Sequence, residues 1–213
     1  MTNKILVISA VLGLLMIVLG TLAYMSGPAK RSPVAEHSAL VRSHSPSFGD
    51  AGAKVHIVEF FDPACDTCRS FYPFVKQMIA ANPGRIRLSI RYAPFHKGSD
   101  QVVRLLEASR RQGKYWETLE ALLAAQSQWV VQHTARLDLA WNAIEGAGLQ
   151  MHKLKEDMSS PELAGVIQQD LQDAVALNVT KTPEFFVNGR PMPSFGYEQL
   201  KTLVEQALRD AYR

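Results

Sequence analysis

The N-terminal part of the chain divides into a long apolar run and a polar stretch. Residues 5–25 carry no charged side chain, and their 21 positions reach the length of about 20 apolar residues that spans a bilayer. Residues 26–52 are rich in Ser, Pro, Gly and His and show no hydrophobic period. This pattern predicts a transmembrane anchor and then a flexible linker, in which His37 and His44 are solvated.

Two patterns further along predict a parallel pair of strands. Val55 to Phe61 is β-branched, aromatic and almost uncharged, which is typical of a strand buried on both faces. Asp62-Pro63 ends this strand, and a helix is predicted from there to about residue 81. Ile86 to Tyr92 alternates apolar and polar residues, which predicts a strand near a sheet edge or with one half-exposed face. The connection should be a right-handed crossover, so both strands end at the same sheet edge.

From residue 99 to about 178 the apolar residues follow a helical period throughout. The predicted helices are 100–112, 115–128, 134–146, 151–158 and 161–177. Two short strands, 184–187 and 190–192, then flank Asn188-Gly189, which is a type I′ hairpin signal, and an amphipathic helix at 197–211 closes the chain. The pattern therefore predicts an α/β domain at 53–213 with an inserted all-helical subdomain at about 98–178.

Composition and charge exclude several classes of protein. A hydrophobic content of 47% with only two cysteines is unlike a disulfide-stapled mini-protein or a disordered chain. The formal net charge of +3, without a run of basic residues, excludes nucleic acid as a partner.

The two cysteines, Cys65 and Cys68, stand three apart at the start of the predicted helix. Residues at this spacing share one helix face, about 5–6 Å apart, which suits a disulfide between neighbouring turns. A thiolate at a helix N-terminus is stabilised by unpaired N–H groups and by the macrodipole. We therefore predict a redox dithiol in which Cys65, nearer the helix start, is the nucleophile and Cys68 resolves the mixed disulfide.

Two other uses of the cysteine pair remain as alternatives. Zinc would need two further ligands, and the six histidines lack the spacing of a zinc site, so no metal or cofactor is expected. An inert structural disulfide is the second alternative, although a bridge that closes so short a loop should stabilise little.

The sequence resembles the thioredoxin superfamily at several positions besides the cysteines. Glu59 lies six residues before Cys65, where the superfamily carries a buried acid, and Pro73 lies eight after it, where a proline kinks the active-site helix. Thr182-Pro183 precedes the predicted hairpin, as the cis-proline loop does in the superfamily. An insertion of some eighty helical residues looks like the DsbA-like branch. The resemblance implies a thioredoxin fold with a helical insertion.

The resemblance also implies an activity, which is thiol–disulfide exchange with extracytoplasmic proteins. Glu59 would carry the proton to or from Cys68, and the backbone of Thr182 beside cis-Pro183 would pair with an extended substrate strand. His96 lies in the loop expected beside Cys65. The implied partners are unfolded or cysteine-containing proteins and a membrane redox partner. A non-catalytic thioredoxin-fold binding or chaperone module with a structural disulfide is the alternative.

The two residues between the cysteines depart from the DsbA pattern. Strongly oxidising relatives carry Pro-His there, whereas this chain has Asp66 and Thr67, which we also count as substrate-binding candidates. A carboxylate at Asp66 should oppose ionisation of Cys65 and make the disulfide less oxidising than one beside Pro-His. The direction of exchange in the cell, as oxidase, isomerase or reductase, stays open.

The expected location is a bacterial inner membrane, crossed once, with the catalytic domain in the periplasm. The order of charge, apolar run and polar linker favours this orientation, although Lys30 and Arg31 after the run oppose Lys4 before it. A cleaved signal segment that releases a periplasmic protein is the alternative, with poor cleavage sites at 21–23 and 27–29.

Overall fold

The computed structural model of this protein describes residues 38–213. The predicted anchor at 1–25 and the first part of the predicted linker lie outside the described residues. Within 38–213, no helix combines the length and the apolar character that crossing a membrane requires.

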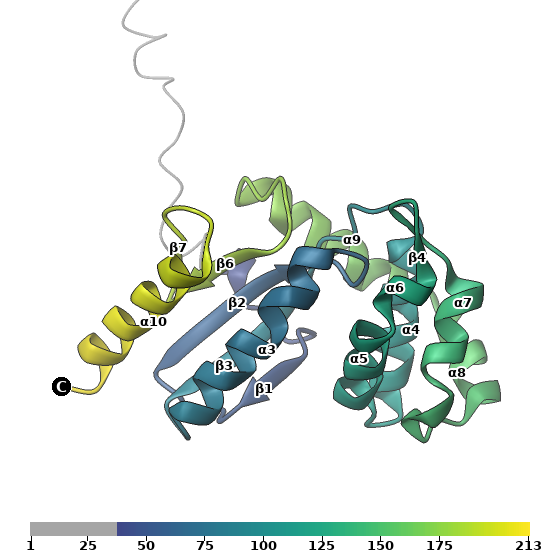
Figure 1. The fold of residues 1–213 in the computed structure, drawn as a ribbon, viewed down its shortest axis with the longest axis horizontal. Coiled ribbons are helices and arrows are strands. Elements are labelled where there is room, and N and C mark those ends of the chain that lie inside the picture. The colour runs from purple at the N-terminus through teal and green to yellow at the C-terminus, as the bar shows by residue number, and fades with distance from the viewer. Residues whose placement is uncertain (1–37) are drawn as a thin grey trace, which may run out of the picture. The chain divides into compact units, whose positions relative to one another are not determined.

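A five-stranded sheet in the order β1-β3-β2-β6-β7 forms the centre of the domain (Figure 1). Its strands are β1 (Ser47–Gly49), β2 (Val55–Phe61), β3 (Ile86–Tyr92), β6 (Glu184–Val187) and β7 (Arg190–Pro191). β2 and β3 are parallel and end together at Phe61 and Tyr92, as the crossover predicts. Asn188 and Gly189 have φ of 47° and 80°, which confirms the predicted type I′ turn.

The first strand, β1, corrects the linker prediction. It pairs antiparallel with β3, so residues 47–49 are not a flexible linker. β3 is the second strand from the edge, near it as predicted, but six of its seven residues are buried, so the alternative of one half-exposed face is wrong. Gly49 explains part of this contact, because its φ is +98° and a Cβ there would lie 2.6 Å from the Ile86 carbonyl oxygen. The linker prediction failed because three residues are too few to show a strand period.

A buried ionic network joins the segment before β1 to β3 and to α9 (Pro161–Ala176). Arg91 of β3 is fully buried, and its Nη2 lies 2.7 Å from Asp170 Oδ1 and 2.5 Å from Asp173 Oδ2. Arg42 Nη2 lies 2.7 Å from Asp173 Oδ1, and His44 Nε2 lies 2.6 Å from Asp170 Oδ1. The prediction of a solvated His44 is therefore wrong. Removing one partner of such a buried network typically costs about 3–5 kcal/mol.

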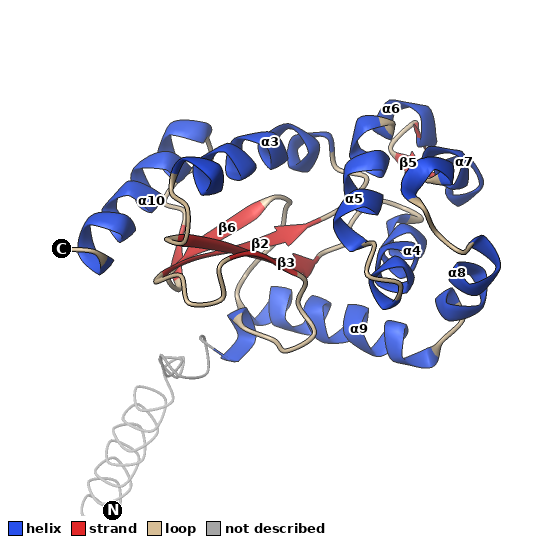
Figure 2. Cartoon of the chain, turned by 90° about the horizontal axis from the view of Figure 1, so that it is seen from below, coloured by secondary structure: helices blue, strands red, loops and turns tan. Residues whose placement is uncertain are grey.

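Helices cover the sheet on both faces. α3 (Asp66–Ala81) and α10 (Tyr197–Ala211) pack on one face and α9 (Pro161–Ala176) on the other (Figure 2). Alternate residues of β2 serve the two faces: Ile57 and Phe61 join the core that includes α3 and α10, and Phe60 joins the core that includes α9. The same alternation places Glu59 on the α3 face, the face from which the cysteine helix starts.

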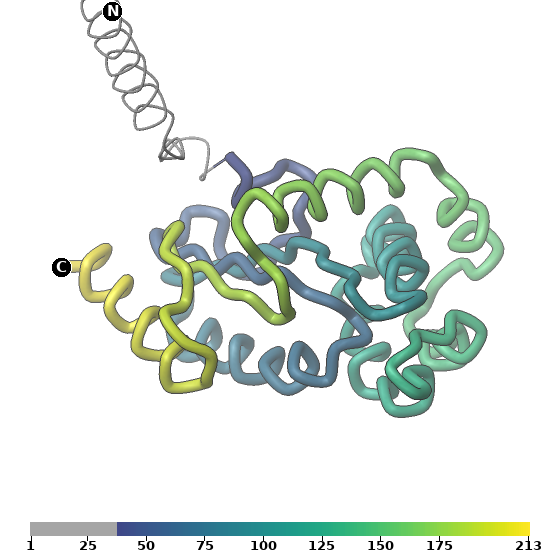
Figure 3. The backbone as a smooth tube through the Cα atoms, turned by 90° about the horizontal axis from the view of Figure 1, so that it is seen from above, coloured from purple at the N-terminus to yellow at the C-terminus, as the bar shows by residue number. Residues whose placement is uncertain are grey.

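A helical subdomain separates β3 from β6, as predicted. Its helices are α4 (Ser99–Arg111), α5 (Tyr115–Ala124), α6 (Gln126–Trp129), α7 (Leu137–Ala143) and α8 (Met151–Met158), with the 3-10 turn η1 (Glu145–Ala147). α9 then leads the chain back to the sheet (Figure 3).

The subdomain differs from the prediction of uninterrupted helices in one region. The predicted helix 115–128 is broken after Ala124, and the predicted helix 134–146 begins with a strand. β4 (Val130–Val131) and β5 (Thr134–Ala135) pair through a turn in which Gln132 and His133 have positive φ. The Ala135 N–H donates to the Lys97 carbonyl at 2.8 Å, so a contact distant in sequence fixes this hairpin.

Candidate active site

The two cysteines lie where β2 turns into α3. Cys65 is the N-cap of α3, and its Sγ accepts the backbone N–H of Cys68 at 3.4 Å. Both are free thiols; Cys65 is 6% exposed and Cys68 is 0% exposed. The sulfur predicted to be the nucleophile is therefore the more accessible of the two.

The Thr182-Pro183 bond is cis, and it lies against the cysteine helix. The Sγ of Cys65 lies 3.4 Å from the carbonyl oxygen of Thr182, a residue 117 positions away. The backbone just before β6 thus lies directly beside Cys65.

The two thiols have opposite electrostatic environments. The pKa of Cys65 is lowered to about 5, first by a hydrogen bond with the Cys68 side chain, against the raising effect of burial, and further by hydrogen bonds with Thr182 and the N–H groups of Thr67 and Cys68. The pKa of Cys68 is raised well above its ordinary value, first by burial and then by Cys65 and Glu59. At neutral pH, Cys65 is the thiolate and Cys68 keeps its proton.

Glu59 lies beneath the dithiol on β2 and is fully buried. Neither of its carboxylate oxygens has a hydrogen-bond partner among the described residues. Burial, and next the charge of Cys65, raises the pKa of this carboxyl well above its ordinary value. Glu59 is thus electrostatically coupled to both cysteines.

His96 lies beside the cysteine turn, as the common strand edge predicts. Its Nδ1 lies 2.8 Å from Oδ2 of Asp62, the last residue before Pro63. Asp62 is fully buried and also accepts hydrogen bonds from the N–H groups of Ala64 and His96 and from the Ser99 hydroxyl. This carboxylate therefore joins the loop at 93–96 to the cysteine turn. Sequence reasoning treated Asp62 only as a strand terminator, although an acid directly after a buried strand was a signal.

Gln126 is a second contact that the sequence did not indicate. It comes from α6 in the helical subdomain and is fully buried. Its Nε2 donates to the carbonyl of Pro63 at 2.8 Å and to that of Cys65 at 3.1 Å. No local pattern distinguishes it from Gln128 on the same short helix.

Asp66 and Thr67 contribute less directly than predicted. The Asp66 side chain is 75% exposed and lies 3.3 Å from the guanidinium of Arg69. It is not among the groups that shift the pKa of Cys65, whereas Thr67 supplies a backbone N–H to that thiolate. Exposure to solvent and the neighbouring cation explain why the expected opposition by Asp66 is weak.

Replacing Asp66 with histidine should still lower the pKa of Cys65, because it exchanges an anion for a partial cation at the helix start. We expect a shift of about half a unit to one unit, reduced by solvent screening, and a more oxidising disulfide. Thiolate absorbance against pH measures it. Asp66→Asn separates the loss of negative charge from the gain of positive charge, and an unchanged titration in Asp66→His would refute the claim.

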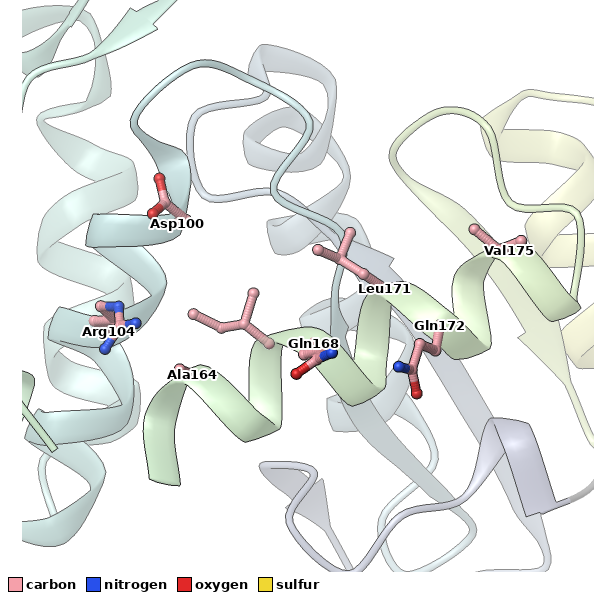
Figure 4. Close-up of a pocket in the computed structure, with 8 residues that line it drawn as sticks. Asp100, Arg104, Ala164, Gln168, Leu171, Gln172 and Val175 are labelled. Carbon is pink, nitrogen blue, oxygen red and sulfur yellow. The ribbon is translucent and has the colours of Figure 1, made fainter. Parts of the chain in front are cut away.

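Other surfaces of the described residues lack this chemistry. The groove between α4 and α9, with a volume of about 530 Å³, is shown in Figure 4. It contains neither a cysteine nor any predicted site residue, and its walls are Asp100, Arg104, Ala164, Ile167, Gln168, Leu171, Gln172 and Val175. Within 38–213 no group of three His, Cys, Asp or Glu side chains is placed to hold a metal ion.

A family model described as thioredoxin matches residues 42–206. The chain belongs to the thioredoxin family. A thioredoxin-like oxidoreductase from Silicibacter pomeroyi superimposes with a TM-score of 0.70 at 30% identity, over 81% of this chain and 96% of that one. Wolbachia pipientis α-DsbA1 superimposes with a TM-score of 0.71 at 17% identity, over 83% and 96%. The thioredoxin fold and the DsbA-like resemblance drawn from the helical insertion are confirmed.

Curated relatives of this thioredoxin-family chain include proteins of two kinds. The Na⁺/H⁺ antiporter NhaA 3 of Salinispora tropica is 30% identical over 149 residues, which are 67% of this chain but 21% of the antiporter. The chain thus spans about a fifth of that protein's length. The probable disulfide bond formation protein D of Bacillus anthracis is 25% identical over 222 residues, with 98% of each chain covered.

Proposed function

We propose that this protein is a thiol–disulfide oxidoreductase that exchanges disulfides with other proteins through Cys65 and Cys68. The observation that carries the proposal is the contrast between the thiols: a Cys65 pKa of about 5 beside a buried Cys68 whose pKa is raised. This contrast suits a mechanism in which Cys65 reacts first and Cys68 reacts only after the mixed disulfide has formed. The full-length similarity to a disulfide bond formation protein supports the same activity.

In the oxidising direction, a substrate thiolate attacks Sγ of Cys65, the Cys65–Cys68 bond breaks, and Cys68 leaves with the electron pair. A second substrate thiolate then attacks the substrate sulfur of the mixed disulfide, and Cys65 leaves as a thiolate. Two electrons move from the substrate to the dithiol, and the substrate gains one disulfide. The Thr182 backbone aligns the substrate strand, Glu59 supplies the proton that Cys68 takes up, and Asp66, Thr67 and His96 border the substrate.

The lowered pKa of Cys65 favours this direction over reduction. A stabilised thiolate stabilises the dithiol relative to the disulfide, and this makes the disulfide a better oxidant. The charge of Asp66 is largely screened, so it subtracts little from this effect. Substrates are unfolded or cysteine-containing proteins, and a membrane redox partner restores the disulfide.

Equilibration with mixtures of reduced and oxidised glutathione tests the proposal. We expect the Cys65–Cys68 bond to be reduced readily, and the oxidised protein to restore activity to a reduced, unfolded substrate enzyme. Resistance of the bond to the glutathione pool, with no effect on refolding, would favour the alternative of a binding or chaperone module with a structural disulfide.

We further propose that residues 1–25 anchor the protein in a bacterial inner membrane and that the folded domain, which includes β1, faces the periplasm. The length of the apolar run and the poor cleavage signals support the anchor. An oxidising dithiol supports the orientation, because a cytosol would hold the pair reduced. Carbonate washing of membranes and protease treatment of spheroplasts test both parts. Release by carbonate would indicate a cleaved segment, and protection from protease a reductant that faces the cytosol.

A further inference from the structure

We propose that Gln126 is a positioning residue for disulfide exchange: from the helical subdomain it holds the backbone on both sides of Ala64 and thereby sets the reactivity of Cys65. The inference deepens the proposed function and rests on it.

The NH₂ end of the Gln126 amide faces the cysteine turn. Both of its partners, the carbonyl oxygens of Pro63 and Cys65, are acceptors only, so the NH₂ group must point at them. Its two N–H bonds are then both used, one on each carbonyl. The Cys65 carbonyl also accepts the Arg69 N–H at 3.1 Å, which is the first helical bond of α3. Gln126 therefore holds the residue at which the active-site helix begins.

The turn that Gln126 holds has few other restraints. Pro63 has no N–H to donate. The two N–H groups of the turn both donate to one residue, Asp62: its carbonyl accepts the Cys65 N–H at 3.0 Å, and its carboxylate accepts the Ala64 N–H at 2.9 Å. Contacts from Asp62 come from the strand side, whereas Gln126 contacts the turn from the subdomain. Without Gln126 the Pro63 carbonyl would lose this hydrogen bond, and the Cys65 carbonyl would keep only the helical bond from Arg69.

The helix that carries Gln126 is itself rigidly placed. Trp129, three residues on, is fully buried, and its Nε1 donates to the Leu122 carbonyl at 2.8 Å. The Arg136 N–H donates to the Trp129 carbonyl, also at 2.8 Å. Because these hydrogen bonds fix α6, Gln126 can hold the carbonyl groups of Pro63 and Cys65 in a defined position.

If Gln126 served packing alone, its buried amide would destabilise the fold. Its Oε1 is buried and has no hydrogen-bond partner among the described residues. An apolar side chain of similar volume would avoid that loss. The two donated hydrogen bonds are thus what this position supplies.

The reactivity of Cys65 depends on the geometry that these bonds hold. Its Sγ is 3.4 Å from the Cys68 nitrogen and 3.4 Å from the Thr182 carbonyl oxygen, distances at which a small shift of the Cys65 backbone changes the contact substantially. Movement away from the helix N–H groups would destabilise the thiolate.

The test replaces Gln126 with methionine, which keeps the length of the side chain and removes both donors. In the full chain we expect the acid dissociation constant of Cys65 to fall, and the glutathione equilibrium to shift toward the protein disulfide. Each constant should change by about three- to tenfold, the size of a typical net hydrogen bond. Gln128→Met, an exposed position on the same helix, should leave both measurements unchanged. Gln126→Asn withdraws the amide by one methylene and serves if the methionine variant does not fold.

Two measurements separate positioning from stability. If a folded Gln126 variant melts at a lower temperature but keeps the wild-type thiolate titration and glutathione equilibrium, Gln126 is merely structural and the inference is overturned. The thiolate titration does not depend on exchange activity. It therefore still decides the role of Gln126 if the wild-type protein proves to be inert toward glutathione and the proposed function fails.

Discussion

Replacing Cys65 with serine should abolish disulfide exchange, whereas replacing Cys68 should trap the protein in mixed disulfides with its substrates. Cys65 is the more exposed sulfur, has a pKa of about 5, and lies against the Thr182 edge where a substrate strand can pair. Without this thiolate the remaining thiol is Cys68, which is fully buried and keeps its proton because its pKa is raised. Without Cys68 the mixed disulfide forms and has no internal thiol to break it.

Adducts are measured by non-reducing electrophoresis after cells or extracts are quenched with acid. We expect substrate-sized shifts with Cys68→Ser that disappear on reduction, and none with Cys65→Ser. The double variant controls for non-covalent association. Adducts with Cys65→Ser and none with Cys68→Ser would show that the two roles are reversed.

Elements with a strong local period could be predicted from the sequence to the residue. The buried run of β2, the helix α8 and the amphipathic α10 end where their patterns end, because the apolar positions of each meet the core. The position of the two cysteines at the start of α3 was also predictable, because strand and helix signals flank them, and the resemblance to the thioredoxin superfamily implied the cis bond before Pro183.

Contacts between distant polar residues could not be predicted in this way. Gln126 lies on a helix of four residues, too short to show a period, and its function depends on carbonyl groups about sixty positions away. The same holds for His44, whose partner Asp170 is 126 positions away. Such pairs depend on how the elements pack, and packing has no signature in a window of a few residues.

Replacing Glu59 with glutamine should slow the release of mixed disulfides while making the folded protein more stable at neutral pH. To attack, Cys68 must lose a proton that burial makes it retain, and Glu59 is the acid whose charge is coupled to this thiol. A raised pKa makes the Glu59 carboxylate a stronger base than an exposed one. Because glutamine cannot accept this proton, we expect reduction of substrate disulfides to slow by about 10²-fold near neutral pH.

The same substitution should slow exchange but raise the stability of the folded protein. The folded-state pKa of Glu59 lies above its unfolded value, so the contribution of Glu59 to stability is fully present below the unfolded pKa, about 4.3, and is lost as pH rises through the folded pKa. A neutral glutamine removes this loss, so denaturant unfolding should show the variant gaining on the wild type as pH rises.

Glu184→Gln is the matched control for the effect on the release of mixed disulfides. Glu184 lies on the neighbouring strand opposite Phe60, and burial raises its pKa too, but it is not among the charges that shift either cysteine. It should leave the rate of mixed-disulfide release at the wild-type value. If Glu59→Gln kept the wild-type rate and pH profile, or if Glu184→Gln slowed release equally, proton transfer by Glu59 would be ruled out.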